Sequence, residues 1–324
     1  MIIKPIGQGK IIGFFEEAIR NNSLGHAYII EGDEGSGKRT LASYLAAVAT
    51  CEKGTFCGEC KMCKQSMADA NPDIISVSAG GQASLKIEVI RDLLDKLSFK
   101  SFHGGRRVII IEDADIMTTQ AQNALLKSIE EPSAGTVFLI LCKRASYMLP
   151  TITSRTQTLS IAPLGMEDLK KIAPDCSAFE YSYCNGNPGV LKRISADGEF
   201  KDFRKAASEV IASVICGDED KLYDCAEFFE ANKDRKADLM TVLTLLVRDV
   251  LYKKSGLDSS IVNTDMIHLV NSISAKCTLP ACTRALAEIL EAESGVLSKY
   301  SSYPMAVQAM LIKARDAITK QEDN

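Results

Sequence analysis

Short apolar runs alternate with segments of helical spacing through the first half of the chain. Four apolar runs have the length of strands: Ala27–Ile30, Ile74–Val77, Arg107–Ile111 and Val137–Leu141. Four segments carry apolar residues every three or four positions and predict helices: residues 8–21, 41–49, 85–97 and 118–130. Strands that alternate with helices predict a parallel sheet with helices on both faces, so we expect an α/β domain over residues 1–162.

The pattern changes after Pro163, where the strand-like runs stop. Residues 165–195 predict two short helices around the turn Gly186–Gly189, and everything after about residue 205 has helical spacing alone. A chain of 324 residues is too long for one ordinary core. We therefore expect a small helical lid domain over residues 163–205 and an all-helical domain over residues 206–324.

A near-complete phosphate-binding loop (P-loop) lies between the first strand and the following helix. Its candidate nucleotide-binding residues are Gly32, Gly35, Gly37, Lys38, Arg39 and Thr40. The segment matches G-x-x-x-x-G-K-[ST] except at the last position. In this motif the glycines and the lysine hold a phosphate, and the hydroxyl of the last residue holds Mg2+. Arg39 stands at this hydroxyl position. Thr40 is a poor substitute, because one helical step turns a side chain by about 100°.

Two carboxylates follow the third predicted strand, at Glu112 and Asp113. A P-loop NTPase commonly has Asp followed by Glu here, the first holding Mg2+ and the second polarising the attacking water. The order is inverted in this chain, so both side-chain lengths are altered. The plainer alternative is a pair of solvated acids at a strand end. Together with Arg39, the inversion predicts a degenerate nucleotide site with impaired hydrolysis, and the sequence leaves open whether it holds a nucleotide.

Four of the eleven cysteines are closely spaced, at Cys51, Cys57, Cys60 and Cys63. Two overlapping C-x-x-C units with a further cysteine can place four thiolates around Zn2+. Four protein ligands leave no position for water, so we expect a structural metal. Thiols that hold no metal are the alternative.

Composition limits the classes of partner. Acidic residues outnumber basic ones, 42 to 38, which argues against tight binding of nucleic acid by this chain alone and favours protein partners. The beginning of the sequence, Met1–Pro5, lacks the charged and apolar pattern of an export signal, and no apolar run has membrane-spanning length. We expect a cytoplasmic protein without a membrane partner.

Several segments in order resemble the bacterial clamp-loader delta prime subunits of DNA polymerase III, members of the AAA+ superfamily. They are His26–Tyr28, the P-loop, the cysteine insert, Ala114–Asp115, Asn123–Pro132 and Leu149–Arg155. The resemblance covers residues 1 to about 195 well, and the remainder agrees in class and length. It implies an AAA+ P-loop domain with a zinc-module insertion at about residues 51–63, a helical lid domain and an all-α collar domain for oligomerisation.

The resemblance also implies a function. Such a subunit joins tau/gamma and delta subunits in a ring that loads the sliding clamp on primed DNA. Ser154 and Arg155 correspond to the element that presents an arginine finger, in trans, to ATP and Mg2+ bound by a neighbouring subunit. The departures at Arg39 and Glu112 imply a stator that binds nucleotide weakly or does not hydrolyse it. For Arg155, a surface arginine that caps a helix is the alternative.

Two rival functions remain at this point. One is an active clamp-loader ATPase of the tau/gamma type, in which Lys38, Thr40 and Glu112 support turnover. The other is an independent zinc-containing module that binds nucleic acid, which the acidic balance disfavours. Polymerase chemistry is not indicated, although the family is part of a DNA-directed DNA polymerase holoenzyme. We interpret Glu130 and Glu131, at the end of a predicted helix, as solvated acids, with a partner across an interface as the alternative.

Overall fold

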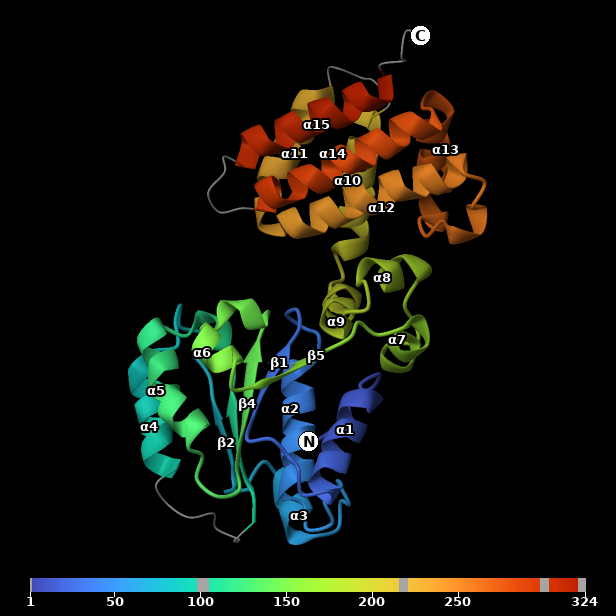
Figure 1. Cartoon of the computed structure of the whole chain (residues 1–324). Coiled ribbons are helices and arrows are strands. Elements are labelled where there is room, and N and C mark those ends of the chain that lie inside the picture. Colours follow the sequence, from blue (N-terminus) through green and yellow to red (C-terminus); the bar gives the residue numbers. More distant parts are fainter. Residues whose placement is uncertain (1, 98–104, 216–220, 298–302, 320–324) are drawn as a thin grey trace. The chain divides into compact units, whose positions relative to one another are not determined.

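The computed structural model of the chain describes residues 2–97, 105–215, 221–297 and 303–319 (Figure 1). The chain forms two compact units. Unit 1 comprises Met1–Pro174 with Gly186–Val190, and unit 2 comprises Asp175–Asn185 with Leu191–Asn324. The finer division into three domains, at residues 162 and 205, stays a prediction.

Unit 1 contains a five-stranded parallel sheet in the order β2-β3-β4-β1-β5. The strands are β1 (Ala27–Glu31), β2 (Ile74–Val77), β3 (Arg107–Ile111), β4 (Thr136–Cys142) and β5 (Gln157–Ser160). Strands β3 and β4 are buried throughout, as expected of continuous apolar runs inside a parallel sheet. The edge strand β5 was missed by the sequence analysis, because it is short and polar.

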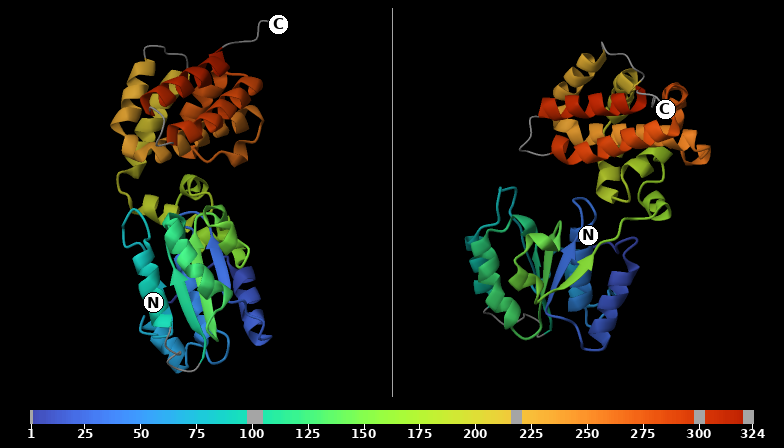
Figure 2. Two further views of the ribbon diagram at one scale, coloured as in Figure 1. Left: turned by 60° about the vertical axis from the view of Figure 1, so that its left-hand side comes forward. Right: turned by 45° about the horizontal axis from the view of Figure 1, so that its top comes forward.

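Helices cover both faces of this sheet (Figure 2). The helices of unit 1 are α1 (Gly9–Arg20), α2 (Lys38–Thr50), α3 (Lys61–Met67), α4 (Ile87–Leu97), α5 (Thr119–Glu130), α6 (Pro150–Thr153) and α7 (Met166–Ile172). Alternate strand residues enter different cores. Ile29 packs in the cluster that includes α4 and α5, and its neighbour Tyr28 packs with α1 and α2 on the other face. The expected α/β fold, a parallel sheet with a P-loop and helices on both faces, is confirmed.

The regular elements that the structure describes in unit 2 are all helices. Its helices are α8 (Ala178–Tyr183), most of α9 (Pro188–Ala196), α10 (Phe200–Ile215), α11 (Lys221–Ala231), α12 (Lys236–Lys254), α13 (Ile267–Lys276), α14 (Leu279–Leu297) and α15 (Tyr303–Thr319). Helix α12 is central and packs against α10, α13 and α14. Its predicted apolar face is confirmed, since Leu239, Leu243 and Leu246 are fully buried.

The segment before unit 2 differs from the prediction. Residues 165–195 contain the three helices α7, α8 and α9 where two were expected, because Pro174 follows α7 and a separate capping box at Ser177 starts α8. Within the described residues, every helix falls short of the length and apolar character needed to cross a membrane.

Candidate functional site

The P-loop lies where the sequence placed it, between β1 and α2. Gly35 and Gly37 adopt left-handed backbone angles, with φ of 80° and 95°, which only glycine adopts without strain. Gly37 is also the residue at which α2 begins. In the described residues, the first turn of α2 has neither a side-chain cap nor an acidic residue, so its backbone N–H groups stay available to an anion.

Lys38 is bound to its own loop. Its Nζ donates hydrogen bonds to the carbonyl oxygens of Gly32 at 2.7 Å and Asp33 at 2.9 Å. Burial lowers the pKa of this amine, and the carboxylate of Asp115 acts in the opposite direction. The lysine therefore braces the loop with two of its three N–H donors, and the third remains for a phosphate.

Arg39, at the hydroxyl position of the P-loop motif, contacts Glu112, which directly follows β3. Arg39 Nε lies 3.3 Å from Glu112 Oε1. The arginine side chain is 77% exposed and the glutamate side chain 16%. Burial raises the pKa of Glu112, and the charge of Arg39 opposes this shift. The structure thus brings together the two residues that the sequence analysis considered separate departures from the motif.

Asp113 and Thr40 have different surroundings. Asp113 adopts a left-handed conformation, with φ of 54°, and its carboxylate accepts a hydrogen bond from the backbone N–H of Ala79 at 3.3 Å. It therefore orders the loop after β2. Thr40 lies exposed on α2, one step beyond Arg39. Of the two candidate carboxylates, Glu112 is the one that contacts the P-loop.

A turn from much later in the chain fastens the tip of the P-loop. Asn187 Nδ2 donates to Glu34 O at 2.7 Å, and the N–H of Gly189 donates to Gly35 O at 3.0 Å. The two backbones touch, because a Cβ added to Gly189 would lie 2.5 Å from Gly35 Cα. The turn is predictable from the sequence, but its contact with the P-loop is not. We call residues 186–190 with the P-loop tip the clasp.

The four predicted metal ligands form one cluster. Sγ–Sγ distances are 3.6 Å for Cys51–Cys57, 3.9 Å for Cys51–Cys60 and 3.8 Å for Cys57–Cys63, and all four sulfur atoms lie within 4.8 Å of one another. A tetrahedron with Zn–S distances of about 2.3 Å has edges of about 3.8 Å. The cluster can therefore hold a metal such as zinc.

Backbone groups prepare two of these sulfur atoms for a metal. The N–H of Cys60 donates to Cys57 Sγ, and the N–H of Cys63 donates to Cys60 Sγ, each at 3.4 Å. Such bonds lower the pKa of Cys57 to about 6. They favour the thiolate that coordinates zinc. Cys60 also caps α3 and Cys63 lies in the first turn of this helix, so α3 fixes the positions of two ligands.

Arg155 lies just after the short helix α6 and is 40% exposed. Its Nε contacts Glu130 Oε1 at 2.7 Å, and its Nη1 donates to Thr151 O at 3.0 Å and Ser154 Oγ at 3.1 Å. The interpretation of Glu130 as merely solvated is wrong, since the fold supplies it with an arginine partner. Among the described residues, the second terminal nitrogen of Arg155 makes no further bond, so it remains open to another molecule.

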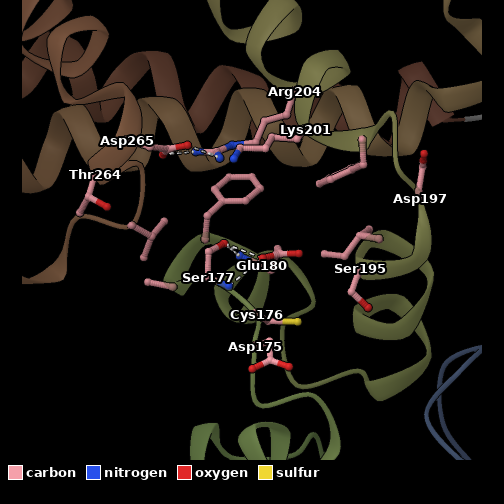
Figure 3. A pocket seen from close by; sticks show the side chains of 15 residues that line it. Asp175, Cys176, Ser177, Glu180, Ser195, Asp197, Lys201, Arg204, Thr264 and Asp265 are labelled. Carbon is pink, nitrogen blue, oxygen red and sulfur yellow. Dashed lines mark hydrogen bonds and ion pairs between the residues drawn. The ribbon is translucent and has the colours of Figure 1, made fainter.

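Unit 2 contains a separate cavity of about 510 Å³ between α8, α9, α10 and residues 262–265 (Figure 3). Arg204 crosses one wall, stacked 3.5 Å from the centre of the Phe179 ring and bonded to Asp265 at 2.8 and 2.9 Å. Its Nη2 also donates to Asn263 at 2.8 Å. These contacts fasten α10 to its neighbours within the unit, and they explain the buried arginine as part of the packing.

Comparison with known proteins gives matches along most of the chain. The family described as DNA polymerase III, delta subunit, matches residues 7–165, and the family described as the C-terminal part of that subunit matches residues 199–301. The chain is 34% identical over 201 residues to DNA polymerase III subunit delta' of Pseudomonas aeruginosa, covering 58% of this chain and 60% of that protein.

Two further similarities extend over more of the length. The chain is 27% identical over 310 residues to subunit delta' of Bacillus subtilis, covering 88% of this chain and 90% of that protein. Among solved structures, a DNA polymerase III gamma subunit-related protein of Thermotoga maritima aligns with 94% of this chain and 99% of its own, at 17% identity and a TM-score of 0.47.

Proposed function

The chain belongs to the DNA polymerase III delta subunit family, and from this membership we propose that it is the delta prime subunit of a bacterial clamp loader. In this role it joins tau/gamma and delta subunits in a ring that loads the sliding clamp on primed DNA in the cytoplasm. The observation that supports this most strongly is the family match in both the P-loop segment and the helical C-terminal segment.

Within the ring, the chain acts on a neighbour's nucleotide through Arg155. A guanidinium keeps its positive charge and holds its N–H donors in a plane, which suits the charge that develops on a transferred phosphoryl group, and Nη2 is the nitrogen available for it. Glu130, Thr151 and Ser154 hold Nε and Nη1, so the side chain is already oriented on the surface. A donor that is already oriented loses less conformational entropy when it contacts the neighbour's ATP and Mg2+.

The chain's own P-loop does not sustain hydrolysis under this proposal. The hydroxyl expected at the metal is replaced by Arg39, and the carboxylate expected at the metal is Glu112, already paired with that arginine. Asp113, which stands where the water-polarising glutamate is expected, is bonded to Ala79 instead. These three departures favour a stator over an active ATPase of the tau/gamma type.

The cysteine cluster holds one structural Zn2+ in this proposal. Its sulfur positions fit the ion, and all four ligands come from the protein, so no coordination position is left for chemistry. Zinc would supply local stability to the segment between α2 and α3, and nothing in the proposed ATP reaction passes through it.

The test is a loader reconstituted from tau/gamma, delta and this chain. Clamp loading and the ATPase stimulated by clamp and primed DNA are measured with the wild type, Arg155→Ala and Arg155→Lys. We expect both variants to assemble and both to lose stimulated hydrolysis, because lysine lacks the planar pair of donors. Arg91→Ala, an exposed arginine on α4, is the matched control.

Two results would refute parts of this proposal. Failure of the wild-type chain to assemble with the other subunits would remove the clamp-loader role. Stimulated hydrolysis that stays the same in Arg155→Ala, within an assembled loader, would remove the arginine finger and leave the subunit assignment intact.

A further inference from the structure

A P-loop implies a bound magnesium ion, and the residues around this loop show whether the ion fits. Mg2+ requires near-octahedral oxygen ligands at about 2.0–2.1 Å, and in P-loops a hydroxyl and a carboxylate supply protein ligands. Here the hydroxyl position carries Arg39, whose guanidinium has no lone pair to offer a metal. The hydroxyl of the next residue, Thr40, is exposed one helical step further on.

The carboxylate position is also engaged. Glu112 Oε1 lies 3.3 Å from Arg39 Nε, so a metal at this oxygen would meet a positive charge already in place. Repulsion between like charges at such a separation is substantial even near a protein surface. Asp113 does not replace Glu112, because its carboxylate accepts the N–H of Ala79 on the far side of the turn. The residues present do not fit the ion.

We propose that Arg39 takes the place of the magnesium ion, so that this pocket excludes divalent cations and meets a nucleoside triphosphate only as the metal-free anion. The two substitutions fit each other, since an arginine brings the positive charge that Glu112 would otherwise receive from the metal. Lys38 and Arg39 then present two adjacent cations at the start of α2, where the helix dipole also favours a phosphate.

The pairing also explains why the two departures from the motif occur together. Glu112 is only 16% exposed, and a buried carboxylate without a partner is costly. Reverting one residue alone would leave either an unpaired glutamate or an arginine without its acid. The inference uses the P-loop as a nucleotide pocket, which belongs to the proposed function, but it is independent of Arg155.

The experiment uses the full chain, without the rest of the loader. Binding of a fluorescent ATP analogue is measured by anisotropy in Mg2+ and in excess EDTA, for the wild type and for the double variant Arg39→Thr/Glu112→Asp. Mn2+ replaces Mg2+ in a parallel measurement by electron paramagnetic resonance, which detects protein-bound metal directly. Arg39→Lys is the matched control, because it keeps the positive charge and adds no metal ligand.

We expect the wild type and Arg39→Lys to bind the analogue more weakly in Mg2+ than in EDTA, because Mg2+ converts the nucleotide into a complex that the pocket rejects, and to bind no Mn2+. The double variant is expected to bind the analogue at least about tenfold more tightly with Mg2+ than without it. Circular dichroism verifies its fold. Arg39→Thr alone serves the same comparison if the double variant does not fold.

Two results would overturn the inference. One is wild-type binding that is as tight with Mg2+ as without it, or tighter, or that brings bound Mn2+. The other is a folded variant that gains no metal dependence. Neither result bears on Arg155, so the proposed role in the assembled loader would stand or fall separately.

Discussion

The carboxylate of Asp238 shows how single residues fasten unit 2 together. Arg193 donates two hydrogen bonds to it, at 2.7 and 3.1 Å, and the hydroxyl of Tyr183 donates a further one. Burial acts to raise the pKa of Asp238, but the bonds from Arg193 and Tyr183 outweigh it and hold the pKa below its usual value. One side chain on α12 thereby connects to α8 and α9.

Removal of this carboxylate should destabilise unit 2. Asp238→Ala leaves the Tyr183 hydroxyl buried without an acceptor and Arg193 without its charge partner, and we expect a loss of about 3 kcal/mol in the free energy of unfolding. The midpoint of urea unfolding measures it. Asp224→Ala is the control, because Asp224 forms an exposed pair with Lys221, and we expect a change below about 0.5 kcal/mol. Equal effects of the two variants would contradict this assignment.

The same carboxylate predicts a pH dependence. Its pKa is lowered by folding, so its stabilising contribution is complete above the unfolded-state pKa of about 3.9 and is lost as the pH falls through the lower folded value. The stability advantage of the wild type over Asp238→Asn should therefore be constant near neutral pH and shrink in acid. Urea unfolding of both proteins across this range measures it, and an advantage that grows in acid would contradict the sign.

Individual site residues differ in how far the sequence could predict them. The glycines, Lys38 and the four cysteines lie in contiguous motifs, so local spacing was sufficient. The pairs Arg39–Glu112 and Arg155–Glu130 could not be predicted, because only the order of strands in the sheet brings these distant segments together. These pairs give both arginines a partner within the chain that the motifs alone do not indicate.

At the scale of elements, apolar runs identified the central strands because those strands are buried on both faces. The edge strand β5 has the polar sequence of an exposed element, and its position was set by pairing with β1. The clasp could not be predicted from the sequence either, because its partner is also distant in the chain. Its residues 186–190 form a turn by local chemistry, but their partner is the P-loop tip, which lies far earlier in the chain.

Two glycine-to-alanine substitutions, one in the clasp and one in α1, should change the free energy of unfolding in opposite directions. Gly189→Ala places a Cβ 2.5 Å from the backbone of Gly35, so we expect it to destabilise unit 1 by about 1–3 kcal/mol. Gly13→Ala lies in the interior of α1 with nothing within 4 Å, and it should stabilise the chain by about 0.4–1 kcal/mol. Urea unfolding measures both, and a neutral Gly189→Ala would show that the clasp does not hold.

The segment between α2 and α3 should depend on its metal. We expect about one zinc per chain by mass spectrometry of the metal content, and loss of that zinc in Cys60→Ser. The midpoint of thermal unfolding of Cys60→Ser should lie about 5 °C or more below that of the wild type, because metal binding contributes directly to folding. Cys176→Ser, a half-buried thiol outside the cluster, is the control. A wild-type chain purified in zinc-containing medium that holds no zinc would contradict the proposal.

At the scale of the whole molecule, the chain combines two units with separate tasks. Unit 1 carries the P-loop, the cysteine cluster and Arg155, and the regular elements described in unit 2 are all helices. In the proposed account, unit 2 contributes the collar of the ring and unit 1 offers Arg155 outward. The nucleotide site that matters for turnover then belongs to a neighbour, and the chain's own pocket is closed to magnesium by Arg39 and Glu112.

Comparing Lys38→Ala with Arg155→Ala in one reconstituted loader tests this account most directly. The quantity is the rate of ATP hydrolysis stimulated by clamp and primed DNA. The account predicts a fall of about tenfold or more for Arg155→Ala and a change within about twofold for Lys38→Ala. The reverse pattern, a loader inactivated by Lys38→Ala and unaffected by Arg155→Ala, would contradict it.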